Sequence, residues 1–311
     1  MIEDAGKEKG FVVGKRPKGY LTFLAGIWKL AYLKPSVPVF GRLMHRIRVK
    51  ATTPDQLNIS YLPVNAQLDV ESLPLPVVIL EGLIRRSEHR IITHRCTCRD
   101  AWNCSKYDRN IGCIHIGAPT AEEDTTVAHH ASVEEAIAHL HKALAAGLVP
   151  FIGHVSADNT IWNVSKDRPF TTVCFCCPCC CTNFDYYRHL PPEAQACIHR
   201  LRGATVGADQ DACIGCGRCA SVCWTGAAVL GGGKSRINPS LCKTCGLCAQ
   251  ACPQQAIRVS VENVEAAVND LLGRIDRDVG GLPVASYREL KETRQAAASG
   301  PARQSRGGLH A

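Results

Sequence analysis

Apolar residues recur at helical spacing in one short segment near the start of the chain. Between residues 20 and 33 they lie three or four positions apart, interrupted by Lys29 and flanked by lysines at both ends. This period predicts an amphipathic helix. The run is 14 residues long, whereas a membrane-spanning helix needs ~20 apolar residues. The helix is therefore expected either to pack on this protein or a partner subunit, or to lie on an anionic membrane surface.

Further along, helical and strand patterns alternate and lead twice into groups of cysteines. A helix is predicted from Pro76 through VVILEGLIRRSEH, because proline is tolerated in a first helical turn, and the strand RIITHR follows it. A second helix is predicted for SVEEAIAHLHKALAAG, where Ser132 and Glu135 form a capping box and Gly147 ends the helix. The strands LVPFIGHV and TTVCF come next. This order predicts an α/β unit with cysteine-rich loops.

The remaining part of the chain contains a compact cysteine-rich unit, a helical pattern and an irregular end. The helical pattern VENVEAAVNDLLGRIDR covers residues 261–277, and the Ala/Gly/Ser/Arg-rich end has no period, which is typical of disorder. The predicted fold class is α+β. We predict five segments: a basic arm with an amphipathic helix (1–58), a cysteine-rich α/β domain (59–208), the compact unit (209–260), a C-terminal helix and extension (261–291), and a disordered tail (292–311).

Cysteine is far above its ordinary frequency, with 19 among 311 residues. In a short secreted chain this would indicate a disulfide scaffold. This chain is long, and its first residues place acid before base with no apolar core, so no signal peptide is predicted. We therefore expect a reducing cytoplasm, where closely spaced cysteines bind metal or do redox work.

Positive charge is concentrated in the N-terminal arm. Residues 1–50 carry eleven Lys and Arg against three Asp and Glu, which accounts for the whole net charge of +8. Such an arm favours an anionic partner, either an acidic protein or a membrane surface contacted through residues 15–50. Nucleic acid is not expected, because a DNA reader needs a basic recognition helix and the helix predicted here is too apolar.

Two runs of four cysteines repeat with an offset of 29 residues. Each has the spacing C-x₂-C-x₂-C-x₃-C: Cys213, Cys216, Cys219 and Cys223, then Cys242, Cys245, Cys248 and Cys252. This is the spacing of bacterial ferredoxins, and residues 209–260 resemble a two-cluster [4Fe–4S] ferredoxin domain. Zinc sites are disfavoured, because zinc ligands come as separated pairs.

The resemblance implies which cysteines share a cluster, since the fourth cysteine of each run binds the other cluster. It implies one cluster on Cys213, Cys216, Cys219 and Cys252, and another on Cys242, Cys245, Cys248 and Cys223. One residue departs from the pattern: Trp224 replaces the proline that usually follows the fourth cysteine. The ligand itself is retained, so the departure concerns local packing and potential.

Ten more cysteines fall in two upstream segments, and the candidate site residues are Cys96, Cys98, Cys104, Cys113, Cys174, Cys176, Cys177, Cys179, Cys180 and Cys181. Residues two apart in an extended chain share a face. Cys174 and Cys176 are therefore expected on one side and Cys177, Cys179 and Cys181 on the other, with a bend at Pro178. Three interpretations stay open: a third iron–sulfur site built from both segments, zinc bound by four thiols, or free and dithiol redox cysteines. Cys197, on a predicted helix, is expected to be a small buried residue.

The order of these motifs also resembles a family of iron–sulfur electron-transfer proteins from anaerobic prokaryotes. The resemblance covers roughly residues 60–260, from C-x-C-R through C-x-C-C-x-C-C-C to the two-cluster unit. It implies the two [4Fe–4S] clusters of the ferredoxin unit, while a cluster on the upstream cysteines does not follow from the resemblance alone. A third iron–sulfur or zinc site and a place in an oxidoreductase complex are separate predictions.

We therefore predict an electron-transfer subunit that passes single electrons to a redox partner protein or complex. No G-x-G-x-x-G follows a predicted strand, so flavin or nicotinamide chemistry is expected on the partner. One alternative is a reductase with a specialised cluster at residues 174–181, fed by the ferredoxin unit. A second is a redox sensor or cluster-assembly factor. The expected location is the cytoplasm, free or on the cytoplasmic face of the membrane.

Overall fold

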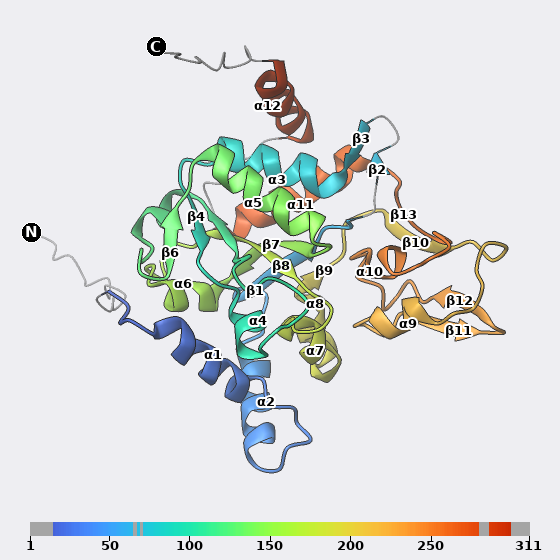
Figure 1. Cartoon of the computed structure of the whole chain (residues 1–311), viewed down its shortest axis with the longest axis horizontal. Coiled ribbons are helices and arrows are strands. Elements are labelled where there is room, and N and C mark those ends of the chain that lie inside the picture. The colour runs from blue at the N-terminus through green and yellow to red at the C-terminus, as the bar shows by residue number, and fades with distance from the viewer. Residues whose placement is uncertain (1–14, 65–66, 69–70, 280–285, 300–311) are drawn as a thin grey trace, which may run out of the picture.

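The computed structural model describes residues 15–64, 67–68, 71–279 and 286–299. A seven-stranded sheet with the order β6-β4-β5-β8-β7-β1-β9 forms its centre (Figure 1). Neighbouring strands are antiparallel except for β1 and β9, which are parallel. In chain order the strands are β1 (Leu57–Tyr61), β4 (Arg90–Thr93), β5 (Ile114–Ile116), β6 (Ala128–His130), β7 (Val149–Val155), β8 (Thr171–Cys176) and β9 (Ile198–His199).

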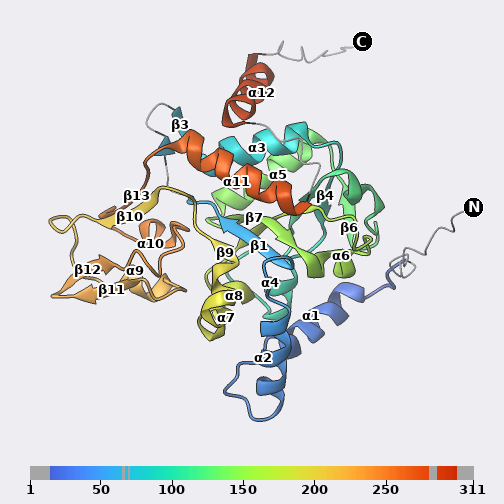
Figure 2. The same cartoon turned by 180° about the vertical axis from the view of Figure 1, so that it is seen from behind.

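Helices lie on both faces of this sheet, as both views show (Figures 1 and 2). One face is covered by α3 (Leu75–Arg86), α5 (Val133–Ala145) and α11 (Val264–Val279). The opposite side carries α1 (Tyr20–Ala31), α2 (Phe40–Lys50), α4 (Thr97–Ala101), α6 (Ser156–Trp162), α7 (Thr182–Tyr186) and α8 (Pro192–Ala196). The observed fold is therefore α+β, as predicted.

The alternation of side chains along β8 separates two packing environments. Val173 and Phe175 point into the main core, between the sheet and the helices α3, α5 and α11. Cys174 and Cys176 point to the other face, where Cys176 packs with Tyr61. This follows from the two-residue period of a strand, and it fixes where these two thiols can act.

A smaller unit follows the sheet along the chain. Its strands pair as β10 (Ala204–Ala208) with β13 (Ile257–Val261) and β11 (Ala228–Gly231) with β12 (Lys234–Ile237). Two short helices, α9 (Arg218–Val222) and α10 (Leu247–Gln250), contact each other inside it. The remaining hairpin, β2 (Gln67–Leu68) with β3 (Glu71–Pro74), precedes α3. Trp224 and Leu247 of the smaller unit pack against Tyr61 and Phe151 of the sheet.

Several local predictions are confirmed. The amphipathic helix forms as α1, and Pro76 lies in the first turn of α3. The Ser132 Oγ atom accepts a hydrogen bond from the backbone N–H of Glu135 over 3.1 Å, which is the predicted cap of α5. Gly147 has a φ of 77°, the left-handed conformation expected after a helix. In the part of the chain that the structure describes, no helix is both long and apolar enough to span a bilayer.

The predicted disordered tail is wrong for its first residues. Helix α12 (Tyr287–Ser299) continues past residue 292 and packs on α3. Leu290 is fully buried there, and a Cβ on Gly82 would lie 2.6 Å from the Leu290 Cδ2 atom. Leu290, seated over a glycine of α3, and the ion pairs Arg294–Glu81 and Arg86–Glu289 thus hold a helix whose composition alone gives no apolar period. Residues 300–311 lie outside the described residues.

Candidate metal centres

Glycines shape the two cysteine loops of the smaller unit. Helices α9 and α10 each begin after a glycine with positive φ, Gly217 at 75° and Gly246 at 82°. Gly215 also has positive φ, and a Cβ there would lie 2.1 Å from the carbonyl oxygen of Gly233. Only glycine fits such a position. The tight turns place the first cysteines of each run in a loop and the third at the start of a helix.

The first three thiols of the first run are brought together with the last thiol of the second. Cys213, Cys216, Cys219 and Cys252 line one cavity, together with the apolar side chains of Ile214, Leu230 and Ile257. Backbone N–H groups point at two of the sulfurs: Ser235 donates to Cys213 Sγ over 3.3 Å and Ala256 donates to Cys252 Sγ over 3.3 Å. Four soft donors with amide support suit a cubane cluster.

The other four thiols form a second group. Burial raises the pKa of Cys245 to about 11, and the charges of Cys242 and Cys223 add to that rise. Burial raises the pKa of Cys248, and the charges of Cys245, Cys242 and Cys223 raise it further. These four thiols therefore lie near one another. The Trp224 Nε1–H donates to Cys245 Sγ over 3.2 Å. Both groupings match those that the ferredoxin resemblance implies, while the role of the eight thiols as ligands stays a prediction.

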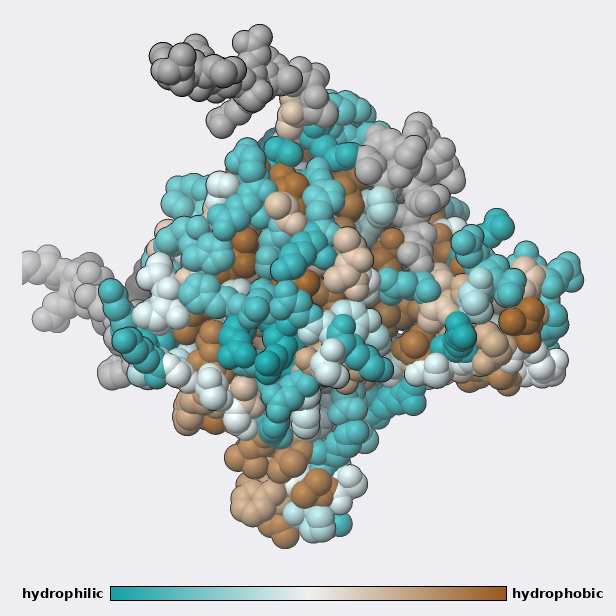
Figure 3. All heavy atoms as spheres, viewed as in Figure 1, coloured by the Kyte–Doolittle hydropathy of each residue, from teal (hydrophilic) through white to brown (hydrophobic). Residues whose placement is uncertain are grey.

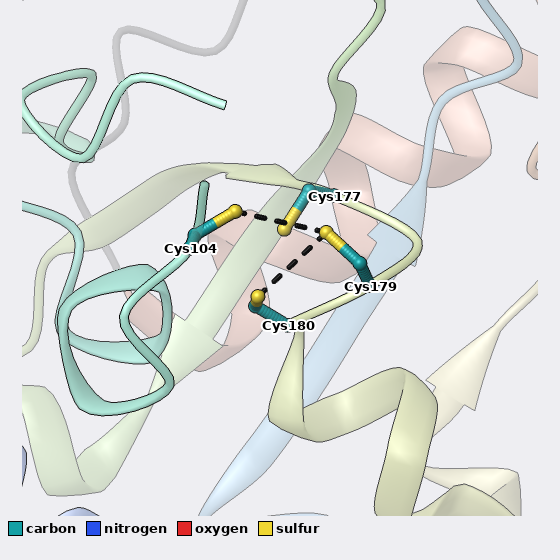
Figure 4. A group of neighbouring side chains, drawn as sticks. All are labelled: Cys104, Cys177, Cys179 and Cys180. Carbon is teal, nitrogen blue, oxygen red and sulfur yellow. Dashed lines mark hydrogen bonds between the residues drawn. The ribbon is translucent and has the colours of Figure 1, made fainter. Parts of the chain in front are cut away.

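The ten upstream cysteines separate into two groups. The first, called here the four-thiol group, consists of Cys104, Cys177, Cys179 and Cys180, whose Sγ atoms all lie within 4.8 Å of one another. Figure 4 shows the four side chains pointing toward one another, with Cys104 coming from one segment and the rest from the turn after β8. The Sγ–Sγ distances are 3.7 Å for Cys104–Cys179 and 3.6 Å for Cys179–Cys180.

These distances fit one tetrahedral ion. Zinc–thiolate bonds of about 2.3 Å in a tetrahedron place the sulfurs roughly 3.8 Å apart. The thiolates of a cubane bind separate iron corners and must stand farther apart. Of the interpretations left open by the sequence, the four-thiol group therefore favours a mononuclear site over a cluster.

The other six thiols, called here the six-thiol pocket, line a cavity of about 480 Å³ between the sheet and helices α1 and α2. They are Cys96, Cys98, Cys113, Cys174, Cys176 and Cys181. Two pairs are close: Cys113 Sγ lies 3.5 Å from Cys174 Sγ, and Cys181 Sγ lies 3.2 Å from Cys176 Sγ. The side chains of Trp28, Tyr32 and Arg48 from the N-terminal arm line the same cavity.

The predicted sidedness of the cysteine run is half right. Cys174 and Cys176 share a side, and Cys177 and Cys179 share the other. Cys181, however, joins Cys174 and Cys176. The reason is that the extended chain ends at Cys176 and turns, with the backbone N–H of Cys181 donating to the carbonyl of Cys177 over 3.2 Å. The alternation of a strand does not apply beyond that point.

Arg99 is a buried charge between the two groups that sequence reasoning did not single out. Its side chain is only 1% exposed and donates to the backbone carbonyls of Asp108 over 3.1 Å, Phe175 over 2.7 Å and Ile111. Burial alone lowers the pKa of a guanidinium, but nearby thiolates, Cys96 and Cys174 foremost, outweigh it and raise the pKa of Arg99. The sequence feature that could have indicated this role is the position of Arg99 directly after C-x-C, in a segment otherwise rich in cysteines.

Two thiols of the six-thiol pocket favour the thiolate form, which is the form that binds metal. The hydrogen bond from Cys96 outweighs burial and lowers the pKa of Cys98 to about 7. Hydrogen bonds from Cys113 and Cys176 hold the pKa of Cys174 well below its ordinary value. Cys197, in contrast, is buried at the end of α8, and its Sγ atom contacts only backbone carbonyls.

Comparison with known proteins identifies one part of the chain. Residues 205–253 match the family model described as a 4Fe-4S dicluster domain. A search of curated proteins and a search of solved structures each found no match. The family match confirms the prediction of an iron–sulfur ferredoxin-like domain here.

Proposed function

We propose that this protein, whose residues 205–253 form an iron–sulfur ferredoxin-like domain, is an electron-transfer subunit with two [4Fe–4S] clusters and a further metal site. The observation that carries the proposal is the gathering of its eight domain cysteines into two groups of four. When bound, each cluster takes up or releases one electron. The chain's own residues would hold the clusters and direct N–H groups at the sulfurs, with Cys219 buried in the first group and Cys248 in the second.

The first group lies nearest the surface and suits exchange with a partner. Cys216 is exposed, and the adjacent Ile214 is 63% exposed. Electron tunnelling falls steeply with distance, so a redox protein must approach closely. An exposed apolar side chain beside an exposed ligand offers that contact. We infer that a partner protein docks at Ile214.

The four-thiol group supports the further metal site. Its four sulfurs suit one tetrahedral ion, zinc or iron. A zinc ion would tie Cys104 to the turn after β8 without carrying electrons. An iron ion would add a one-electron centre.

The N-terminal arm supports contact with an anionic membrane at the cytoplasmic face. Residues 15–50 contain nine Lys and Arg and no acidic residue. Exposed apolar side chains on the same segment include Phe23, Val39 and Phe40, at 64%, 75% and 61% exposure. Figure 3 shows hydrophobic residues gathered at the end of the molecule that carries α2. Apolar area next to positive charge is the combination that binds peripheral proteins to anionic lipid.

The test is iron content and EPR on protein purified without oxygen. We expect about eight iron atoms per chain from the domain, two reducible [4Fe–4S] signals, and transfer of electrons to a one-electron acceptor. The double variant Cys216→Ser and Cys245→Ser should lose both signals. Cys197→Ser is the matched control, because this buried cysteine belongs to none of the thiol groups. A wild-type domain with zinc in place of iron, or with no reducible cluster, would overturn the proposal.

A further inference from the structure

The six-thiol pocket has no role in the function proposed above, and its composition exceeds what one ion needs. A zinc ion takes four ligands, whereas six thiols line this cavity. Crowded free thiols are prone to oxidation, so a protein gains by ligating them. Soft thiolates with a cavity between them suit an iron–sulfur cluster. Cubane ligands bind separate corners, so only one thiol of the close pair Cys113–Cys174 and one of the close pair Cys176–Cys181 would bind it, together with Cys96 and Cys98. The buried Arg99 donates to the backbone carbonyl of Phe175, the residue between Cys174 and Cys176, and so places a positive charge near the thiolates.

A chain of aromatic side chains connects this pocket to the ferredoxin-like domain. Trp224 donates to Cys245 Sγ over 3.2 Å. The ring of Trp224 stacks on Phe184 with centroids 4.8 Å apart, and it lies 5.2 Å from the ring of Tyr61. The hydroxyl of Tyr61 lies 3.9 Å from Cys176 Sγ in the six-thiol pocket. The route thus runs from Cys245 through two side chains to Cys176, and Trp224, Tyr61 and Cys176 belong to one packed cluster.

The two side chains that link the thiols are buried. Tyr61 has no exposed surface, and Trp224 is 7% exposed. Trp224 also occupies the position where the ferredoxin pattern has proline, so the one departure from that pattern is the residue that makes the connection. A proline there could neither donate to Cys245 nor reach Tyr61.

We propose that the six-thiol pocket binds an iron–sulfur cluster of its own, and that Trp224 and Tyr61 couple it to the cluster at Cys223, Cys242, Cys245 and Cys248. This inference rests on the proposed function, since it requires a cluster in that second group. One electron leaves the reduced ferredoxin cluster, which is oxidised by one, and enters the pocket cluster, which is reduced by one. No bond breaks and no proton moves. The reductant is a one-electron donor protein that docks on the ferredoxin-like domain.

The first experiment compares two double variants of the full chain, purified without oxygen. Cys98→Ser with Cys174→Ser should lose about four iron atoms, as a [4Fe–4S] cluster holds, while the two ferredoxin EPR signals remain. Cys104→Ser with Cys179→Ser, in the four-thiol group, should keep those iron atoms, and Cys197→Ser should match wild type. Retained ferredoxin signals show that the pocket variant is folded. Unchanged iron in that variant, or loss of zinc alone, would overturn the inference while leaving the proposed function standing.

The second experiment measures the connection. A reduced flavodoxin, too large to enter the pocket, is mixed with oxidised protein, and the reaction is followed by freeze-quench EPR. Trp224→Leu and Trp224→Phe both lose the hydrogen bond to Cys245, but only Trp224→Phe keeps an aromatic ring. We expect the pocket cluster to be reduced at least ten-fold more slowly in Trp224→Leu than in Trp224→Phe, with the ferredoxin clusters reduced at equal rates in these two variants. Tyr61→Phe, which keeps the ring and removes only the hydroxyl, should give a smaller delay. Equal rates of pocket-cluster reduction in Trp224→Leu and Trp224→Phe refute the coupling, whereas slow reduction of the ferredoxin clusters in wild type refutes the proposed function instead.

Discussion

The indole N–H of Trp224 donates a hydrogen bond to the sulfur of Cys245 over 3.2 Å. Donors aimed at a ligand sulfur stabilise the more negative, reduced state of a cluster and raise its potential. Trp224→Phe keeps an aromatic ring and removes the donor, so one cluster should become harder to reduce. A difference of about 1 kcal/mol between the redox states, typical for one hydrogen bond, corresponds to roughly 40 mV for one electron.

An EPR-monitored redox titration measures this shift. Trp102→Phe is a matched control, because Trp102 is half exposed and its contacts lie on α4, outside the ferredoxin-like domain. The second cluster's potential should fall in Trp224→Phe and stay constant in Trp102→Phe. An unchanged or higher potential in Trp224→Phe would count against a ligand role for Cys245.

The four-thiol group should bind one metal ion per chain. Cys179→Ser removes one of four sulfurs that lie within 4.8 Å of one another, so we expect loss of one equivalent of zinc or iron and a lower melting temperature, because metal binding is coupled to folding. Metal analysis and thermal unfolding report the result. Cys197→Ser provides the comparison, and the same metal content in both variants would rule out a site at this group.

Arg99 should matter far more than an arginine at the surface. Arg99→Met leaves three backbone carbonyls without their donor and removes the charge facing the thiolates. We expect the free energy of unfolding to fall by ~3–5 kcal/mol, as for a buried ionic group that loses its partner. Arg168→Met is the control: this side chain and its partner Glu122 are both exposed, and such pairs contribute about 0–1 kcal/mol. Denaturant unfolding measures the loss of unfolding free energy in each variant. Equal losses in the two variants would contradict the stabilising role of Arg99.

Leu290 should hold helix α12 on α3. Leu290→Ala removes a fully buried side chain, which typically costs ~2–5 kcal/mol. Because α12 is at the edge of the fold, we expect the lost stability to be local. It should be measured as faster amide hydrogen exchange within α12 and the facing turn of α3. Leu241→Ala, at a half-exposed position, should leave exchange in α12 unchanged. Protection of α12 equal to wild type in Leu290→Ala would mean that other contacts hold the helix.

Binding to anionic vesicles should depend on the exposed apolar residues of the N-terminal arm. Phe23→Ser combined with Phe40→Ser removes two side chains that are more than 60% exposed, without touching the basic residues. Flotation with vesicles containing phosphatidylserine should show weaker binding, and added salt should weaken the wild type further. The control is Ile214→Ser, an exposed apolar residue on the ferredoxin-like domain. Equal binding by all three proteins, or none, would exclude the arm as a lipid contact.

Sequence reasoning found those parts of the site that local rules determine. Glycine and cysteine spacing define the ferredoxin-like loops, and the strand period places Cys174 and Cys176 together. The turn at Cys177–Cys181 depends on a backbone hydrogen bond that no period predicts. For this reason Cys181 was predicted on the wrong side, and Cys180 was assigned to neither side. Arg99 and the Trp224–Tyr61 contact arise between segments far apart in the chain. Helix α2 was missed because residues 34–58 were treated as part of the arm, and α12 because its burial depends on Leu290 meeting Gly82.

Cys176 and Cys177 are joined by a single peptide bond, yet one belongs to the six-thiol pocket and the other to the four-thiol group. Whatever fills one site fixes the backbone from which the other is built. The order of loading during biogenesis therefore has consequences. An ion bound early through Cys177 would fix the position of Cys176 before a cluster binds in the six-thiol pocket. If the four-thiol group held no ion, the position of Cys176 would be less restricted. Maturation of the two centres is thus expected to be sequential and mutually dependent.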